Sequence, residues 1–283
     1  MRIQLIMLLL LTCFFTASAY AQEEEKFLFP PVPDLSELVM TGEAQVEAVI
    51  DPLRVQLLDG RIVQLASIDI PDLTPYDTGD LGMAALEVMR EQLVKKTVKI
   101  YQSKDTKNAR ANRMGYHLAH LVEKNGGFWT QGALIANGLA RVRPSKHNAE
   151  MTPAMLTLES EAREGKRGLW ADAKYAILTS ETAASGLYNW AIVEGTINAS
   201  AVANNTVYLN FGPDWKTDFT IGIKPDVRRK LANMGIDPLS FANKPVRVRG
   251  WMESYNGPYI ELMDPVWIEP LPAQTEAASL DNN

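Results

Sequence analysis

The chain has 283 residues and a mass of 31.4 kDa, which fits two compact modules or one large one. Hydrophobic residues make up 46% and charged residues 22%, so the chain can build a core and wholesale disorder is excluded. A formal net charge of −6 excludes a generally basic nucleic-acid-binding protein, although not a local basic patch. The single cysteine and three histidines exclude a disulfide framework and a Cys-based zinc site, and leave little room for a His-rich metal centre.

Residues 1–21 have the pattern of an export signal. Arg2 precedes an apolar run of about a dozen residues, and Ala19 and Ala21 place small residues at the cleavage site. The run is too short for a comfortable membrane span, and no later stretch reaches the roughly 18 apolar residues needed. A lipoprotein signal using Cys13 is the alternative, but the small residue expected before that cysteine is missing. We therefore expect an exported protein, periplasmic or secreted, whose mature chain has no cysteine, as suits an oxidising compartment.

The next part of the chain predicts a linker and then a small β-barrel with helices. Residues 22–41 are acidic and Pro-rich, which is typical of a linker or an extended arm. Asp59-Gly60, between two β-branched and apolar runs, predicts a hairpin. The third helix is expected to have Thr152 as its N-cap and Pro153 at its first position. Strands are expected at 44–50, 54–58, 62–68, 97–101 and 116–123, and helices at 79–95, 129–136 and 152–164. Short strands followed by helices predict a barrel with three packed helices over residues 42–175.

The remainder of the chain predicts a second barrel. Residues 176–189 contain a run of small and polar residues and are expected to form a linker. Strands are expected at 191–197, 207–211, 219–223, 245–252 and 259–263, with one helix at 225–233. Five strands with an inserted helix are the plan of an OB-fold, here over residues 190–271. Residues 272–283 are polar and are expected to form a disordered tail. The predicted fold class is mainly β with α: two OB-type barrels.

Four segments of the first module occur in an order that resembles the staphylococcal-nuclease-like (thermonuclease) family, over residues 43–171. They are VIDPLRVQLLDGRIVQLASIDIPD at 49–72, ARANRMGYHLAHLVEKNG at 109–126, TQGALIANGLARV at 130–142 and LESEAREGKRGLW at 158–170. The resemblance implies Ca²⁺-dependent hydrolysis of phosphodiester bonds in DNA and RNA. In that chemistry two Asp carboxylates and a carbonyl hold the cation, a Glu activates water, and two Arg residues clamp the phosphoryl oxygens.

This sequence departs from the family pattern at most of the site positions. The resemblance places Leu53 where the family has a metal-binding Asp, and Asp72 where it has the catalytic Glu. The two catalytic Arg positions match Gln64 and Tyr116, and only the second metal-binding Asp, Asp69, is kept. The loss of a single well-placed donor typically lowers the rate ~10²–10³-fold. Neither an amide nor a phenol supplies a fixed positive charge.

Two questions remain open for this site. Asp69 and Asp72 are candidate metal ligands, whereas Asp69 has a structural alternative, which is to accept hydrogen bonds from backbone amides in the turn before Pro71. Nearby arginines are candidates to replace the lost cations or to bind nucleic acid: Arg54, Arg61 and Arg113. Strand alternation is expected to point Arg54 away from the side that Leu53 faces. A small slip in the alignment around residues 105–116 would instead bring Arg110 or Arg113 to a catalytic position.

The second module resembles OB-folds of the nucleic-acid-binding type in the segments 193–212 and 246–271. Such domains stack bases on aromatic side chains and follow phosphates with cations. The candidate residues are Tyr208, Phe211, Trp251, Tyr255 and Tyr259 for stacking, and Lys216, Arg247 and Arg249 as cations. The alternative is that these aromatics pack in the core or rim and that the arginines are the polar face of a half-solvated strand. OB-folds also bind proteins and sugars, and the fold alone does not choose among them.

The leading functional hypothesis is an exported nuclease-like protein that has lost phosphodiesterase activity and acts as a binding or structural module. Its expected partners are single-stranded nucleic acid or an envelope protein, and we expect no cofactor. The alternative is a divergent metal-dependent nuclease, which would use Ca²⁺. An active enzyme is expected to gather carboxylates and cations in one cleft, and an inactive one to show neutral or apolar groups there. A third hypothesis is a purely structural pair of barrels.

Overall fold

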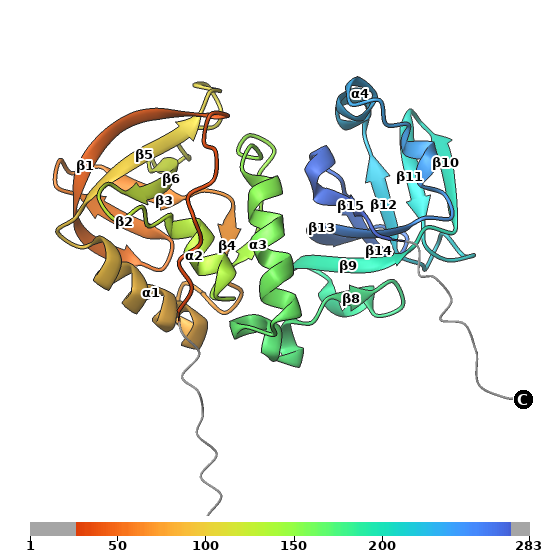
Figure 1. The fold of residues 1–283 in the computed structure, drawn as a ribbon. Coiled ribbons are helices and arrows are strands. Elements are labelled where there is room, and N and C mark those ends of the chain that lie inside the picture. Colours follow the sequence, from red (N-terminus) through yellow and green to blue (C-terminus); the bar gives the residue numbers. More distant parts are fainter. Residues whose placement is uncertain (1–26, 273–283) are drawn as a thin grey trace, which may run out of the picture.

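The structure is a computed structural model that describes residues 27–272. The expected export signal at residues 1–21, the first residues of the linker and nearly all of the expected tail lie outside the described residues. No helix in this described part of the chain is long and apolar enough to cross a membrane. Figure 1 shows two barrels side by side, with α3 (Thr152–Glu164) standing between them.

The first barrel is closed by five strands in the order β1-β2-β3-β6-β5. Alternation of half-buried and buried positions along β2 and β3 directs Val55, Leu57, Val63 and Leu65 into its core. Strands β3 and β6 are parallel, and the other neighbouring pairs of the barrel are antiparallel. The bounds are β1 Leu38–Asp51, β2 Arg54–Leu57, β3 Ile62–Leu65, β5 Thr97–Ser103 and β6 His117–Glu123.

Three α-helices accompany this barrel: α1 (Gly79–Leu93), α2 (Thr130–Ala136) and α3. Helix α1 buries Ala85, Leu86, Met89 and Leu93, which recur at three- and four-residue spacing. Helix α3 begins at Thr152 with Met151 as its cap residue and no side-chain cap, so Thr152 is not the N-cap that the sequence predicts. A separate short ladder pairs β4 (Ile68–Asp69) with β7 (Arg141–Val142).

The second sheet has the order β10-β11-β12-β14-β13-β9-β8, and β15 pairs with β13. Strands β9 and β10 follow each other in the chain with only Ile197 and Asn198 between them. Strand β10 is the first strand in the order of the sheet and β9 is the next to last, so the two ends of the sheet are joined by one continuous segment. Strands β12 and β14 are parallel, and α4 (Pro225–Asn233) lies between β12 and β13 in the chain. The bounds are β8 Leu178–Thr179, β9 Trp190–Thr196, β10 Ala199–Ala203, β11 Thr206–Asn210, β12 Thr220–Ile223, β13 Pro245–Ser254, β14 Pro258–Glu261 and β15 Ile268–Pro270.

The two barrels share one succession of elements. In each, the third strand of the barrel is parallel to the fifth, and a helix follows the third strand, namely α1 after β3–β4 and α4 after β12. Each has its own hydrophobic core. The predicted fold class, mainly β with α, is confirmed: a closed five-stranded barrel with three helices is followed by a second strand-rich module with one inserted helix, whose strand order is consistent with the predicted OB-type barrel.

Two segments that the sequence predicts as linkers pack on the barrels. In the first, Phe27 and Val32 lie against the core of the first barrel, and β1 begins at Leu38, before the expected domain start at residue 42. In the second, β8 pairs with β9, and Ala183 is buried in the second core. Residues 178–186 therefore belong to the second barrel rather than forming a free connection.

The barrels meet through a buried ion pair. Arg249 on β13 is fully buried, and its Nη2 lies 2.9 Å from Glu159 Oε2 on α3 and 2.8 Å from Glu269 Oε1. Its Nη1 donates to the carbonyl of Val142 at 3.1 Å. Arg249 therefore joins the barrels and is not a surface cation, in contrast to its expected role in binding nucleic acid.

Candidate functional site

The first metal-ligand position presents hydrocarbon. Leu53 lies in the turn between β1 and β2 and packs against the core of the first barrel. Its backbone N–H donates to Asp51 Oδ1 at 2.9 Å, and the other oxygen of Asp51 pairs with Arg54. The turn is thus held by Asp51, and position 53 offers no side-chain oxygen to a cation.

The retained carboxylate of Asp69 is bound by two arginines. Its Oδ2 accepts a hydrogen bond from Arg141 Nε at 3.0 Å and lies 2.9 Å from Arg141 Nη2 in an ion pair, and its Oδ1 accepts a hydrogen bond from Arg143 at 2.9 Å. Asp69 and Arg141 are direct partners in the β4–β7 ladder, which places the two side chains together. The partners of Asp69 are therefore guanidinium groups, not the backbone amides of the structural alternative.

Asp72 faces the start of α1. Its Oδ2 accepts a hydrogen bond from the backbone N–H of Leu81 at 3.2 Å, in the first turn of the helix. Its Oδ1 is buried, and no polar group among residues 27–272 pairs with it. Gly79 has φ +67°, and a Cβ atom there would lie 2.4 Å from the carboxyl carbon of Asp72. The carboxylate therefore accepts a hydrogen bond from a free backbone N–H group in the first turn of the helix, where negative charge is favourable.

The residues at the family's metal positions do not fit a Ca²⁺ site. A calcium site needs several free oxygen ligands, whereas Leu53 has none and both oxygens of Asp69 are engaged. Within residues 27–272, no group of three or more His, Cys, Asp or Glu side chains is arranged to hold a metal ion.

The two catalytic arginine positions carry a neutral network with Arg54 beside it. Gln64 Oε1 accepts a hydrogen bond from Asn112 at 2.8 Å, and Asn112 Oδ1 accepts one from the N–H of Tyr116 at 3.1 Å. Arg54 is the direct cross-strand partner of Gln64, and its guanidinium carbon lies 5.4 Å from the centre of the Tyr116 ring. A hydrogen bond to Asp51 raises the pKa of Arg54. Arg54 therefore brings a positive charge to this place, already paired with a carboxylate.

Arg54 also lines a groove with the loop that precedes α1. The groove has a volume of about 900 Å³ and includes the carboxylates of Asp51, Asp77 and Asp80. Its wall contains Tyr76, whose side chain is almost fully exposed. The groove thus gathers carboxylates and a cation, which is the feature expected of an active enzyme rather than of an inactive one.

The other nominated arginines of the first barrel have local roles. Arg61 pairs with Asp59 at 2.7 Å within the β2–β3 hairpin, and Arg113 is exposed in the turn before β6. Arg110 donates to the carbonyl of Ser103 at 2.8 Å.

The candidate nucleic-acid-binding residues of the second barrel do not all lie on one surface. Arg247 pairs with Glu194 at 2.6 Å, and Trp251 lies beside Arg143 and Trp190 at the boundary between the barrels. Phe211 packs in the core of the second barrel.

Tyr208 and Tyr255, by contrast, line one hollow together with Trp215. Lys216 lies next to that hollow, with its Nζ 5.7 Å from the Trp215 ring centre. Sequence reasoning missed Trp215 because its loop, residues 212–219, has no periodic pattern.

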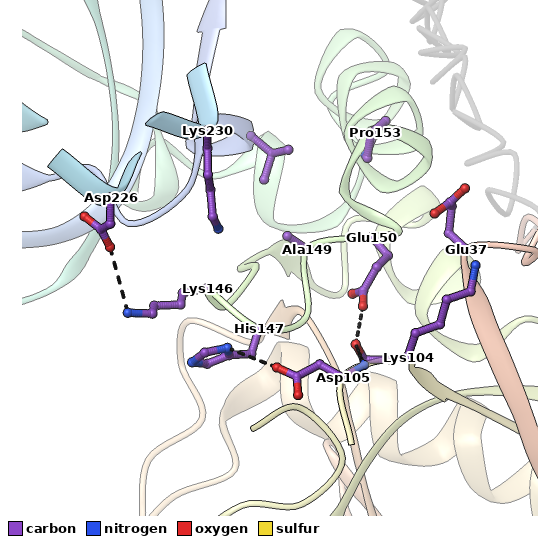
Figure 2. Close-up of a pocket in the computed structure, with 12 residues that line it drawn as sticks. Glu37, Lys104, Asp105, Lys146, His147, Ala149, Glu150, Pro153, Asp226 and Lys230 are labelled. Atoms are coloured by element: carbon purple, nitrogen blue, oxygen red, sulfur yellow. Dashed lines mark hydrogen bonds and ion pairs between the residues drawn. The ribbon is translucent and has the colours of Figure 1, made fainter. Parts of the chain in front are cut away.

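A further cleft, of about 660 Å³, lies between the barrels (Figure 2). Two pairs of charged groups lie within it: His147 lies 3.7 Å from Asp105, and Lys146 reaches Asp226 on α4 at 4.0 Å. Figure 2 shows the Lys146–Asp226 pair reaching from a loop of the first barrel to α4, whereas the His147–Asp105 pair lies within the first barrel. The cleft does not present one sign of charge, and no spacing in the sequence points to it.

A comparison with curated proteins finds none that matches this chain. A scan against family models gives a match at residues 62–172, to the family described as Staphylococcal nuclease homologue. The match begins at β3, so it includes Gln64, Asp69, Asp72 and Tyr116 and leaves out the turn that carries Leu53. Together with the closed five-stranded barrel, this match identifies residues 62–172 as belonging to a staphylococcal-nuclease-like domain.

Proposed function

We propose that this chain is an exported nuclease-like protein that does not hydrolyse phosphodiester bonds and acts as a binding or structural module. The observation that carries the proposal is the state of Asp69, whose two carboxylate oxygens are both engaged by Arg141 and Arg143. The negative charge of a carboxylate held in this way is already compensated by two guanidinium groups, which disfavours a cation beside it, and the charge that the cation would bring to a phosphate is then missing.

The contacts around Asp69 support a structural role for it. Arg141 also donates to the backbone carbonyl of Trp190 in the second barrel at 3.1 Å. The guanidinium of Arg143 lies 5.2 Å from the centre of the Trp190 ring. The same two arginines therefore bind Asp69 and contact the second barrel, so the carboxylate supports the junction between the two barrels.

The proposal is tested by incubating the purified mature chain with denatured DNA and with RNA in Ca²⁺, in Mn²⁺ and in chelator. We expect no metal-dependent cleavage. An Asp69→Ala variant, purified in the same way, controls for contaminating nuclease. Metal-dependent cleavage by the parent that disappears in this variant contradicts the proposal.

A restored variant tests whether the fold still holds the old site. Leu53→Asp, Gln64→Arg and Tyr116→Arg return the missing side chains, and Arg143→Ala is added to free Asp69 Oδ1. Weak Ca²⁺-dependent cleavage by this fourfold variant, and none without Arg143→Ala, would support the role assigned to the arginine.

A second candidate function, a divergent metal-dependent nuclease, is favoured by the groove beside Arg54. That groove is lined by Asp77 and Asp80 together with Arg54, which is the cross-strand partner of Gln64 at a lost catalytic arginine position. If this function holds, cleavage by the parent would be strongly reduced by Arg54→Ala and unaffected by Arg61→Ala, since Arg61 is paired with Asp59 in the hairpin.

The proposed module has single-stranded nucleic acid or an envelope protein as its candidate partners. Of the three cations nominated on the second barrel, Arg249 is buried and Arg247 is paired with Glu194, and Lys216 lies beside Trp215. Binding of nucleic acid through these nominated residues would therefore depend on few phosphate contacts.

A further inference from the structure

The outer face of the second barrel contains a hollow next to Tyr208. Along β11, Val207 and Leu209 point into the core, so Tyr208 points outward. Its direct neighbours in the sheet are Ala201 on β10 and Gly222 on β12, both with little or no side chain. The small side chain of Ala201 therefore leaves space on one side of the outward-facing Tyr208 ring, and Gly222 admits the Tyr259 ring on the other side.

Two exposed aromatic residues form the walls of this hollow, and a third aromatic ring supports it. Trp215 and Tyr255 are 55% and 56% exposed and come from the loop before β12 and the β13–β14 hairpin. The ring of Tyr259 is buried and lies 5.5 Å from that of Tyr255, and a Cβ atom at Gly222 would lie 1.8 Å from its hydroxyl. Glycine at 222 thus allows the Tyr259 ring to lie across β12. The resulting hollow has a volume of about 490 Å³, within the range of small-ligand sites.

The polar groups at this hollow are neutral and can both donate and accept hydrogen bonds. The lining includes the side-chain amides of Asn204, Asn210 and Asn256. The hydroxyl of Thr220 donates to Asn210 Oδ1 at 3.1 Å, which orients this amide and leaves its NH₂ group as a donor. Aromatic faces with amides at their edges suit a ligand that is apolar on its faces and hydroxylated around its rim.

The charge around the hollow disfavours a polyanion. None of its lining residues is charged. The adjoining loops and strand ends carry the carboxylates of Asp214, Asp218 and Glu253, together with Lys216, which contacts Trp215. Burial, together with the negative charge of Glu261, raises the pKa of Tyr259. Nucleic-acid binding gains most of its affinity from phosphate contacts, which this surface does not supply.

We propose that this hollow, formed by Tyr208, Trp215, Tyr255 and the three asparagines, binds a neutral saccharide chain. A pyranose ring presents C–H groups on its faces, which pack on the electron-rich face of an indole or phenol ring. Its hydroxyl groups bond to amides at the edges. The inference concerns the second barrel alone and does not depend on whether the nuclease-like domain is active.

The test is a binding measurement on the full mature chain with four probes: cellohexaose, chitohexaose, maltohexaose and a short oligothymidylate. Tryptophan fluorescence and titration calorimetry are recorded at low and at physiological salt. We expect at least one neutral hexasaccharide to bind, with an affinity that does not change with salt. Trp215→Ala and Tyr255→Ala should each weaken this binding about 10-fold or more, which corresponds to about 1.4 kcal/mol.

Trp251→Ala is the matched control, because Trp251 is a similarly exposed tryptophan on the same barrel that lies outside the hollow. It should leave saccharide binding unchanged, and thermal unfolding should show that all three variants remain folded. Three outcomes overturn the proposal: the parent binds none of the saccharides at millimolar concentration; Trp251→Ala weakens binding as much as Trp215→Ala does; or oligothymidylate alone binds, with the salt dependence of a polyanion.

Discussion

Arg249 and Glu159, which are 90 positions apart in the chain and belong to different barrels, form an ion pair in which both side chains are fully buried, at 2.9 Å. Glu159 is further bonded to the backbone N–H of Val142 at 2.8 Å and to Arg163 at 2.9 Å. Buried charges are tolerated only when hydrogen bonds replace their lost hydration, and this network supplies them from both barrels. The junction between the barrels thus has a charged centre.

Arg249→Met should strongly destabilise the protein. It leaves Glu159 buried with one cation, Arg163, in place of two, and breaking a buried pair by removing one partner typically costs about 3–5 kcal/mol. Denaturant unfolding of the full chain measures the loss. Lys124→Met, which removes the exposed pair with Glu43, should cost less than about 1 kcal/mol, and equal effects of the two substitutions would contradict the importance given to the buried pair.

Gly138→Ala should destabilise the first barrel far more than Gly60→Ala. Both glycines have positive φ, +64° and +84°, so each substitution pays the left-handed backbone cost of roughly 1–2 kcal/mol. A Cβ atom at Gly138 would also lie 2.0 Å from the backbone carbonyl oxygen of Arg167, whereas nothing lies within 4 Å of one at Gly60. Overpacking adds about 1–3 kcal/mol at position 138. Thermal unfolding of the two variants would show equal shifts if this backbone contact were unimportant.

Millimolar Ca²⁺ should leave the melting temperature of the parent chain unchanged. A ligand that binds only the folded state raises stability with its concentration, and the oxygens of Asp69 are already engaged by Arg141 and Arg143. Differential scanning fluorimetry with Ca²⁺ and with chelator measures the shift. The fourfold variant that restores the family's side chains serves as the positive comparison, and a Ca²⁺-dependent rise in the parent would contradict the geometry assigned to Asp69.

Local sequence signals predicted most of the fold because the barrels are built from short-range patterns. The turn at Asp59-Gly60 and the helix that starts at Pro225 lie where glycine in a turn and proline at a first helical position place them. The role of Arg249 was not predictable in this way. It alternates with valines on β13 like the polar face of a half-solvated strand, and only the packing of α3 against that strand buries it.

In the candidate site, too, some features could be predicted from local sequence and others depend on contacts between distant residues. The substitutions at Leu53, Gln64 and Tyr116 follow from matching residues to a family pattern. The pairing of Asp69 with Arg141 depends on a ladder between residues 72 positions apart, which no local spacing reveals. Trp215 was missed for a related reason, because a tryptophan in an irregular loop becomes part of a site only when Tyr208 and Tyr255 are folded next to it.

His120 should make the protein less stable as the pH falls below the range of an ordinary histidine. Its ring is buried on β6, and burial lowers its pKa to about 3 from the 6.5 of an ordinary histidine. Between those two values the unfolded chain binds one proton that the folded chain does not, so stability is present above pH 6.5 and is progressively lost below it. The loss attributable to this one group is about 1.4 kcal/mol per pH unit.

The measurement is the free energy of unfolding from pH 7 to about 4.5, compared between the parent and His120→Gln, because carboxylates elsewhere also titrate at the acid end of this range. The glutamine keeps a hydrogen-bond acceptor for the indole N–H of Trp129, which lies 3.4 Å from His120 Nδ1, but it cannot take up the proton. The free energy of unfolding of the variant should therefore fall less steeply with decreasing pH than that of the parent, and the difference in slope should correspond to about one proton. His147→Gln alters a histidine at the surface, 3.7 Å from Asp105, and should keep the parent's steep slope. Parallel curves for the parent and His120→Gln would contradict the prediction, because they would mean that His120 takes up its proton in the folded protein as well. The enclosure of His120 by Trp129 and the strands of the barrel opposes this, since a buried imidazolium without a partner would lose its hydration.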